Sequence, residues 1–196
     1  MNGTLIQAHR EGKGATGCGI AISKEELEKN SISTILRARW SKADLFLTEM
    51  NGKRVVLKDF SKKMFIIRII GRIQIWREEK AYRALRGLDG IPRFCGRPDA
   101  CSIVIEYVEG TRLTHYRGAV PFKRLIEEIK RLIDSVHGAG VIHKDLRGRE
   151  NIIVRAGDDK LMLLDLAGAM IFRAGSVPHK LLFNLLKKVD DAAYLK

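Results

Sequence analysis

Four polar side chains stand at the ends of apolar runs in the second half of the chain, within VIHKDLRGREN and LLDLAG. They are His143, Asp145, Asn151 and Asp165. Carboxylate and amide oxygens suit Mg²⁺, and a carboxylate can orient a hydroxyl that attacks a phosphate. Phosphoryl transfer depends chiefly on positioning and on charges held around the phosphates. A site of this kind also needs a lysine at the phosphates and a glutamate that holds it.

The candidate lysine is Lys58, in the apolar run KRVVLKDF. This run follows ADLFLTEM, and Asn51 and Gly52 separate the two. Asn-Gly between alternating runs is a strong signal of a type I′ β-hairpin. We therefore expect Lys58 late on the third strand of an antiparallel sheet whose first strand is STILRARW. A lysine in a half-buried apolar strand would be costly without a partner.

The glutamate that could pair with Lys58 lies on a helix predicted from about residue 62 to residue 86. Glu78 and Glu79 are both available there. Apolar residues three, four and seven positions from Glu78 share its face of the helix: Ile75, Ala81, Tyr82 and Leu85. Glu79 lies four residues before Arg83, which suits a solvated ion pair. We therefore predict that Glu78 is the partner of Lys58.

The rest of the pattern predicts an α+β chain with strands first and helices later. CSIVIEYVEG is typical of a strand that leads into a linker, and the strongest helix pattern begins at Pro121 and ends at Gly138. A hairpin from NIIVRA and KLMLLDL and a last amphipathic helix follow. The predicted units are a leader over residues 1–30, whose short helix is capped by Ser23, a first lobe over 31–108 and a second lobe over 109–196.

The order of these residues resembles that of the protein-kinase-like superfamily. The resemblance is greatest to small bacterial kinases of the lipopolysaccharide-kinase type, with RIO-type kinases more distant, and runs from about Ser31 to the C-terminus. It implies a two-lobed fold: an antiparallel sheet with one main helix, then a short and mostly helical second lobe. It also implies ATP and Mg²⁺ as cofactors and transfer of the γ-phosphate to a hydroxyl group.

The resemblance implies roles for residues of the second lobe. Asp145 would be the catalytic base, and Asn151 and Asp165 would hold Mg²⁺ against the phosphates. His143 would brace the loop. Arg147 would touch the γ-phosphate, or else be a solvated loop arginine.

The resemblance also implies roles in the first lobe. Lys58, held by Glu78, would contact the α- and β-phosphates. Backbone groups of Glu106 and Val108 would bind adenine, and this reading is compatible with an ordinary buried strand followed by a turn.

The chain departs from the kinase pattern in three places, and two of them, the longer loop and the missing glycines, motivate a second hypothesis. Five residues separate Asp145 from Asn151, one more than in H-R-D-x-x-x-x-N, and Gly148 could absorb the resulting bulge. The turn ARWSKADLF contains no glycine, and DLA at Asp165 replaces DFG. A nucleotide-binding pseudokinase that acts as a scaffold is therefore the alternative to an active enzyme.

The net charge of +13 predicts attraction to polyanions, and residues 61–100 concentrate it with ten Lys and Arg against four acids. This segment is first interpreted as a solvated helix face, next as a surface for anionic lipid or glycan phosphate, and last as an RNA-binding module. The acceptor could be a protein Ser or Thr or a sugar of a lipopolysaccharide-core type. The absence of a secretory signal pattern predicts a cytoplasmic protein, with a candidate peripheral contact at the inner membrane face.

Overall fold

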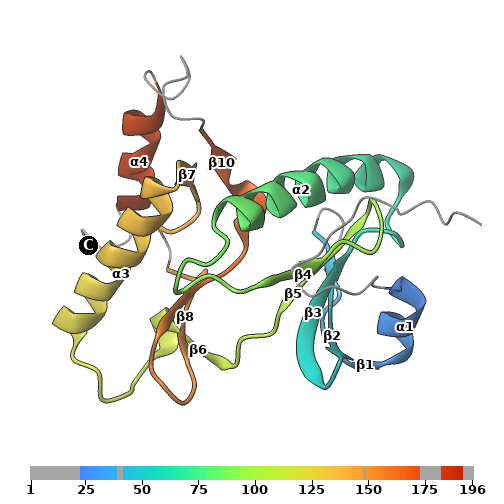
Figure 1. The fold of residues 1–196 in the computed structure, drawn as a ribbon, viewed down its shortest axis with the longest axis horizontal. Helices are drawn as coiled ribbons and strands as arrows, with labels where there is room; N and C mark the ends of the chain where they lie inside the picture. The colour runs from blue at the N-terminus through green and yellow to red at the C-terminus, as the bar shows by residue number, and fades with distance from the viewer. Residues whose placement is uncertain (1–22, 39–41, 148, 173–181, 192–196) are drawn as a thin grey trace, which may run out of the picture.

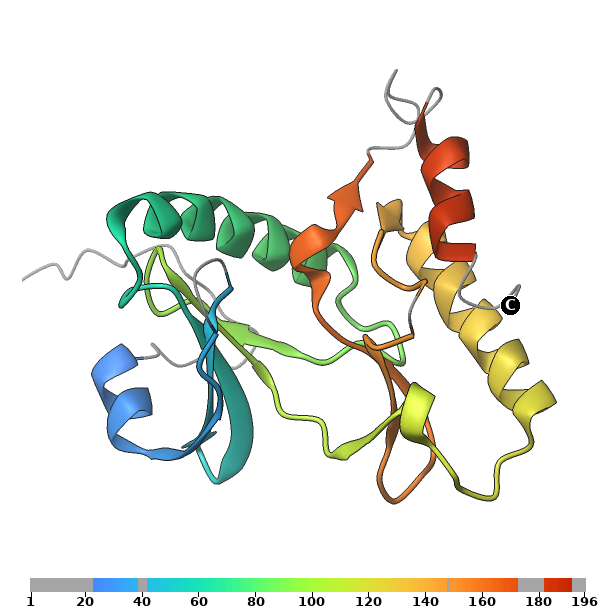
Figure 2. The ribbon, with the colours of Figure 1, turned by 180° about the vertical axis from the view of Figure 1, so that it is seen from behind.

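The computed structural model describes residues 23–38, 42–147, 149–172 and 182–191. Figures 1 and 2, which view it from opposite sides, show two lobes joined by the stretch between strands β5 and β6. Residues 1–22 of the predicted leader lie outside the described residues, as does Gly148. None of the helices in the described ranges combines the length and the hydrophobicity needed to cross a membrane.

The first lobe is built on a five-stranded antiparallel sheet with the order β1-β2-β3-β5-β4. Its strands are β1 Ser31–Leu36, β2 Asp44–Met50, β3 Lys53–Asp59, β4 Phe94–Gly96 and β5 Ser102–Glu106. Asn51 and Gly52 join β2 to β3 with φ angles of 53° and 70°. These two left-handed residues confirm the predicted hairpin, because a type I′ turn needs positive φ at both central positions. Lys58 lies late on β3, as predicted.

A short helix, α1 Lys24–Lys29, precedes the sheet. Its Leu27 packs in a small core with Val55 and Leu57 of β3. Ser23 stands at the start of this helix, but its side chain makes no capping hydrogen bond and instead donates to the Glu25 carboxylate at 3.5 Å. The predicted capping role of Ser23 is therefore wrong, because its hydroxyl turns to a neighbouring acid rather than to a free backbone N–H.

The main helix of the first lobe is α2 Phe65–Ala84. One of its faces is buried and includes Gly71, Ile75 and Glu78. Its C-terminal half reaches across to the second lobe, where it contacts η2 Leu166–Gly168 and β10 Met170–Ile171 (Figure 1). Because α2 touches both lobes, its position couples them.

The second lobe combines two helices with two small antiparallel sheets, β6-β8-β9 and β10-β7. Besides η2 and β10 it contains β6 Gly110–Arg112, η1 Leu113–His115, α3 Phe122–Gly138, β7 Val141–Ile142, β8 Ile152–Arg155, β9 Leu161–Leu163 and α4 Asn184–Asp191. The helix expected from Pro121 and the hairpin around residues 157–159 are confirmed. Strands β7 and β10 are two residues long, too short to leave a period-two signal in the sequence.

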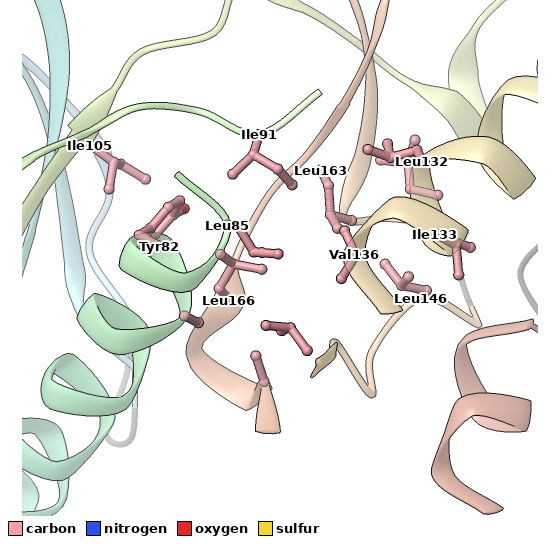
Figure 3. Close-up of a cluster of buried hydrophobic side chains, with 14 of the residues drawn as sticks. Tyr82, Leu85, Ile91, Ile105, Leu132, Ile133, Val136, Leu146, Leu163 and Leu166 are labelled. Atoms are coloured by element: carbon pink, nitrogen blue, oxygen red, sulfur yellow. The ribbon is translucent and has the colours of Figure 1, made fainter. Parts of the chain in front are cut away.

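One hydrophobic core runs through both lobes (Figure 3). From the first lobe it receives Tyr82 and Leu85 of α2 and Ile105 of β5. From the second lobe it receives Leu132 and Val136 of α3, among others. Leu166 of η2 and Leu163 of β9 belong to the same cluster, and Figure 3 shows Leu166 near Leu85 and Leu163 near Val136. The lobes are therefore packed against each other through side chains as well as joined by the chain.

We predict opposite effects for Gly→Ala substitutions in the two long helices. A Cβ at Gly71 of α2 would overlap the buried ring of Phe60, so Gly71→Ala should lower the free energy of unfolding by about 1–3 kcal/mol. A Cβ at Gly138, the last residue of α3, meets nothing within 4 Å. Gly138→Ala should therefore raise it by about 0.5–1 kcal/mol. Chemical denaturation measures both, and stabilisation by Gly71→Ala would contradict the packing of α2 on Phe60.

Candidate active site

A buried ion pair links the sheet to α2. Lys58 Nζ lies 2.6 Å from Glu78 Oε1, and the two residues are 9% and 1% exposed. Burial alone would lower the pKa of Lys58, but the carboxylates of Glu78 and Asp165 outweigh it and raise that pKa above its ordinary value. The predicted pairing of Lys58 with Glu78 is confirmed. Glu79 instead pairs with Arg83 at 2.9 Å and with Arg97 at 3.0 Å.

Asp165 is the second carboxylate at Lys58, with Oδ1 2.9 Å from Nζ. It precedes η2 in a left-handed backbone conformation, φ 58°, and its side chain is 52% exposed. Burial opposes its ionisation, but the charge of Lys58 lowers the pKa of Asp165 below its usual value. The carboxylate is therefore ionised near neutral pH, with part of its surface open to a ligand.

His143 connects Asp165 to the loop that follows β7. Its Nε2 lies 2.9 Å from the carbonyl oxygen of Leu164, and its Nδ1 accepts a hydrogen bond from the Asp145 backbone N–H at 3.3 Å. These partners require a neutral ring that carries its proton on Nε2. Burial lowers the pKa of His143, which agrees with that state. The bracing role expected of His143 thus has a geometric basis.

Asn151 lies against Asp145 in spite of the extra loop residue. Its Nδ2 donates to Asp145 Oδ2 at 3.0 Å and to the Asp145 carbonyl at 2.8 Å. The backbone carbonyl of Asn151 accepts a hydrogen bond from the N–H of Leu164, the neighbour of Asp165, at 2.7 Å. Arg149, within the lengthened loop, has a φ of 57°. This left-handed residue turns the chain back, so that the added residue does not displace Asn151.

Asp190 of α4 was not predicted as a site residue, yet its side chain binds the backbone of the same loop. Its carboxylate accepts the backbone N–H groups of His143 at 2.6 Å and Lys144 at 2.7 Å. It is fully buried and also lies 3.2 Å from His137 Nε2 of α3. The sequence does contain a signal for it: Asp190 follows the apolar residues of the last helix with the spacing of its buried face.

The contact with Asp190 matters because Lys144 has a φ of 72°. A lysine in the left-handed region costs on the order of 1 kcal/mol or more and persists only when its surroundings fix it. Here the carboxylate of Asp190 fixes the N–H of Lys144 and that of its neighbour His143. The last helix therefore sets the conformation from which Asp145 projects.

Comparison with solved structures identifies this architecture. The Rio2 kinase of Chaetomium thermophilum, in a crystal structure of its ADP/Mg²⁺-phosphoaspartate complex, superposes with a TM-score of 0.59 at 18% sequence identity. The match covers 83% of this chain and 55% of that one. The chain has a protein-kinase-like fold. The predicted fold class, with its antiparallel sheet, main helix and second lobe, is confirmed.

Two curated proteins are similar in sequence to this kinase-like chain. One is the probable serine/threonine-protein kinase fnkB of Dictyostelium discoideum, 32% identical over 59% of this chain and 24% of its own length. The other is a probable bifunctional tRNA threonylcarbamoyladenosine biosynthesis protein of Methanothermobacter thermautotrophicus, 29% identical over 71% of this chain and 25% of its own length. The chain thus spans about a quarter of each.

Together with the fold, these sequence similarities support the assignment of the chain to the protein-kinase-like superfamily. No protein-family model matches the chain. The assignment to the lipopolysaccharide-kinase type remains a prediction.

Three other predicted residues of the kinase-like fold lie at the edges of this network. Arg147 is exposed and forms no hydrogen bond or ion pair within the described residues. Glu106 ends β5, and its side chain accepts from Arg93. Val108 follows in the stretch that joins the lobes. The roles predicted for the three stay predictions, and the backbone of Glu106 and Val108 is placed where the two lobes meet.

The donors at this site suit Mg²⁺. Asp165 offers a carboxylate, and the amide oxygen of Asn151 remains available because its Nδ2 donates to Asp145. These are hard oxygen ligands, which Mg²⁺ prefers in company with phosphates and water rather than in an all-protein cage. Within the described residues no group of three or more His, Cys, Asp or Glu could hold a metal by itself. The residues therefore fit a magnesium ion delivered with a nucleotide.

We predict that Asp190→Ala lowers the free energy of unfolding by about 3 kcal/mol, because two buried backbone N–H groups lose their acceptor. The matched control is Asp134→Ala on α3, which removes exposed ion pairs with Lys130 at 3.2 Å and with Lys187 at 4.0 Å and should cost less than about 1 kcal/mol. Chemical denaturation provides the comparison. Equal losses in the two variants would show that Asp190 does not hold the loop.

Proposed function

We propose that the chain is an ATP-dependent phosphotransferase that moves the γ-phosphate onto a hydroxyl group. The observation that carries the proposal is the convergence on Lys58 of Glu78 at 2.6 Å and Asp165 at 2.9 Å. The hydrogen bonds of His143 and Asn151 connect that cluster to Asp145. A buried lysine between two carboxylates, beside a third carboxylate on an exposed loop, is the arrangement that phosphoryl transfer requires.

In this proposal each residue acts on a different part of the reaction. Lys58, kept cationic by its neighbours, would bind the α- and β-phosphates. Asp165 and Asn151 would hold Mg²⁺, which when bound neutralises charge on the phosphate oxygens. Asp145 would orient the acceptor hydroxyl and receive its proton at a carboxylate oxygen. The Asn151 amide fixes one oxygen of that carboxylate at 3.0 Å, so its direction is set before an acceptor arrives.

The acceptor is proposed to be a protein Ser or Thr, or a sugar hydroxyl of a lipopolysaccharide-core type. Asp145 is exposed, which allows either class to approach. The kinase named among the curated relatives favours the protein acceptor. Assays of both classes with one preparation distinguish them.

The central prediction is that the protein transfers phosphate from ATP in the presence of Mg²⁺ and that Asp145→Asn strongly slows the transfer. Loss of a positioned base should slow turnover by about 10²–10⁴-fold and leave Mg·ATP binding nearly unchanged. Transfer of the radiolabelled γ-phosphate of ATP to Ser/Thr peptides and to dephosphorylated core oligosaccharide measures the turnover. Asp134→Asn on α3, the same substitution away from the site, is the control. Binding of ATP without any turnover would instead support a pseudokinase scaffold.

The two magnesium positions should separate in a binding experiment. Asp165→Ala should weaken Mg·ATP binding by about tenfold or more, because a full charge beside the ion is lost. Asn151→Ala should weaken it less and reduce turnover more, because that amide also holds the Asp145 carboxylate. Titration of ATP with and without Mg²⁺ measures the binding. Equal losses of Mg·ATP affinity in the two variants would contradict this prediction and show that Asn151 contributes as much as Asp165 to binding the metal.

A further inference from the structure

One face of α2 exposes a row of large apolar side chains. Phe65 and Ile66 are each 67% exposed and Trp76 is 48% exposed. Ile69, Ile70 and Ile73 lie between them and are exposed as well. Six large apolar side chains on one side of a helix form a continuous patch, which marks a surface that contacts something else. This row is called the α2 face below.

Cations flank the α2 face, and no acid interrupts it. The sequence from Lys62 to Arg77 contains five Lys or Arg and no Asp or Glu. Lys62 and Arg72 are both exposed, and the Lys62 ammonium lies 3.8 Å from the exposed Glu28 carboxylate of α1. Lys80 lies over the ring of Trp76, with Nζ 3.6 Å from its centroid. The long stems of these side chains can lie along apolar surface while their charges reach a polar phase.

A second set of exposed apolar residues lies on β10, on α4 and at residue 182, two positions before α4. They are Ile171, Leu182, Leu185 and Val189. Both views place β10, α4 and α2 along one edge of the molecule, opposite the edge formed by α1 and β6 (Figures 1 and 2).

We propose that the α2 face binds an anionic lipid surface, into which its apolar row inserts while the flanking cations contact phosphate headgroups. The proposal holds whether or not the chain transfers phosphate. A second copy of the chain is a poor occupant, because it would bring Lys62 and Arg72 against the same cations. An apolar row with aromatic rings at both ends and cations at its borders is the composition of helices that lie in a membrane interface.

The test is binding to vesicles of phosphatidylcholine with and without phosphatidylserine, measured by co-sedimentation and by Trp76 fluorescence in a Trp40→Phe background. Binding should require phosphatidylserine, weaken as salt rises from low to physiological concentration, and shift Trp76 emission to the blue. Lys62→Glu with Arg72→Glu should weaken binding by at least about 20-fold, since each cation near such a surface contributes about fivefold.

A matched pair of phenylalanines separates insertion from general charge attraction. Phe65→Ala, on the α2 face, should weaken vesicle binding by about fivefold or more. Phe122→Ala, at the start of α3, removes a ring that is 65% exposed and should leave binding unchanged. Circular dichroism of each variant checks that the fold is retained, and Phe65 and Phe122 are both exposed.

Three results would overturn the proposal. One is absence of binding to anionic vesicles at low salt. Another is an equal effect of Phe65→Ala and Phe122→Ala. The third is a blue shift of Trp76 emission with an acidic polypeptide such as poly-glutamate when vesicles produce no shift. That result would make the α2 face a docking site for an acidic protein.

Discussion

The buried charge of Lys58 is the constraint on which the arrangement of the first lobe depends. A lysine in this position is tolerated only where carboxylates meet it, because an unpaired charge in an apolar interior is very costly. One carboxylate comes from α2 and the other from the start of η2. The pairing therefore fixes the distance of α2 from the sheet and, at the same time, the distance of one lobe from the other.

Asp190, a second buried charged residue, fixes the position of neighbouring segments in the second lobe, as Lys58 does in the first. It is satisfied by two backbone N–H groups and lies beside His137. Lys58 thus binds side-chain carboxylates, whereas Asp190 binds backbone N–H groups. Lys58 is linked to the loop of Asp145 through Asp165 and the ring of His143, and Asp190 binds the backbone N–H groups of His143 and Lys144 in that loop. The site is held from two sides by interactions that a solvent-exposed loop could not supply itself.

The sequence predicts those parts of the site that local patterns determine. Lys58 and Glu78 were predictable because an Asn-Gly turn sets the strand, and helical spacing sets which glutamate faces it. The contact of Asp190 with the loop depends on how α3, α4 and β7 pack, and no local pattern encodes that. Asn151 shows the same limit: the extra loop residue predicts a bulge, but not that Arg149 would be left-handed or that Asn151 would contact Asp145. Ser23 shows that a favourable residue type at a helix start does not ensure a capping bond.

The core that passes without interruption from Tyr82 and Ile105 to Val136 and Leu163 also determines how the molecule can move (Figure 3). Lobes separated by a wet crevice can rotate about their connecting segment at little cost. Here rotation would shear a close-packed apolar interior, which has few voids and resists deformation. Amides at the end of α2 and along β9 should accordingly exchange with deuterium through one shared opening event. The two lobes would then behave as a single cooperative unit, although the chain crosses between them by a short connection.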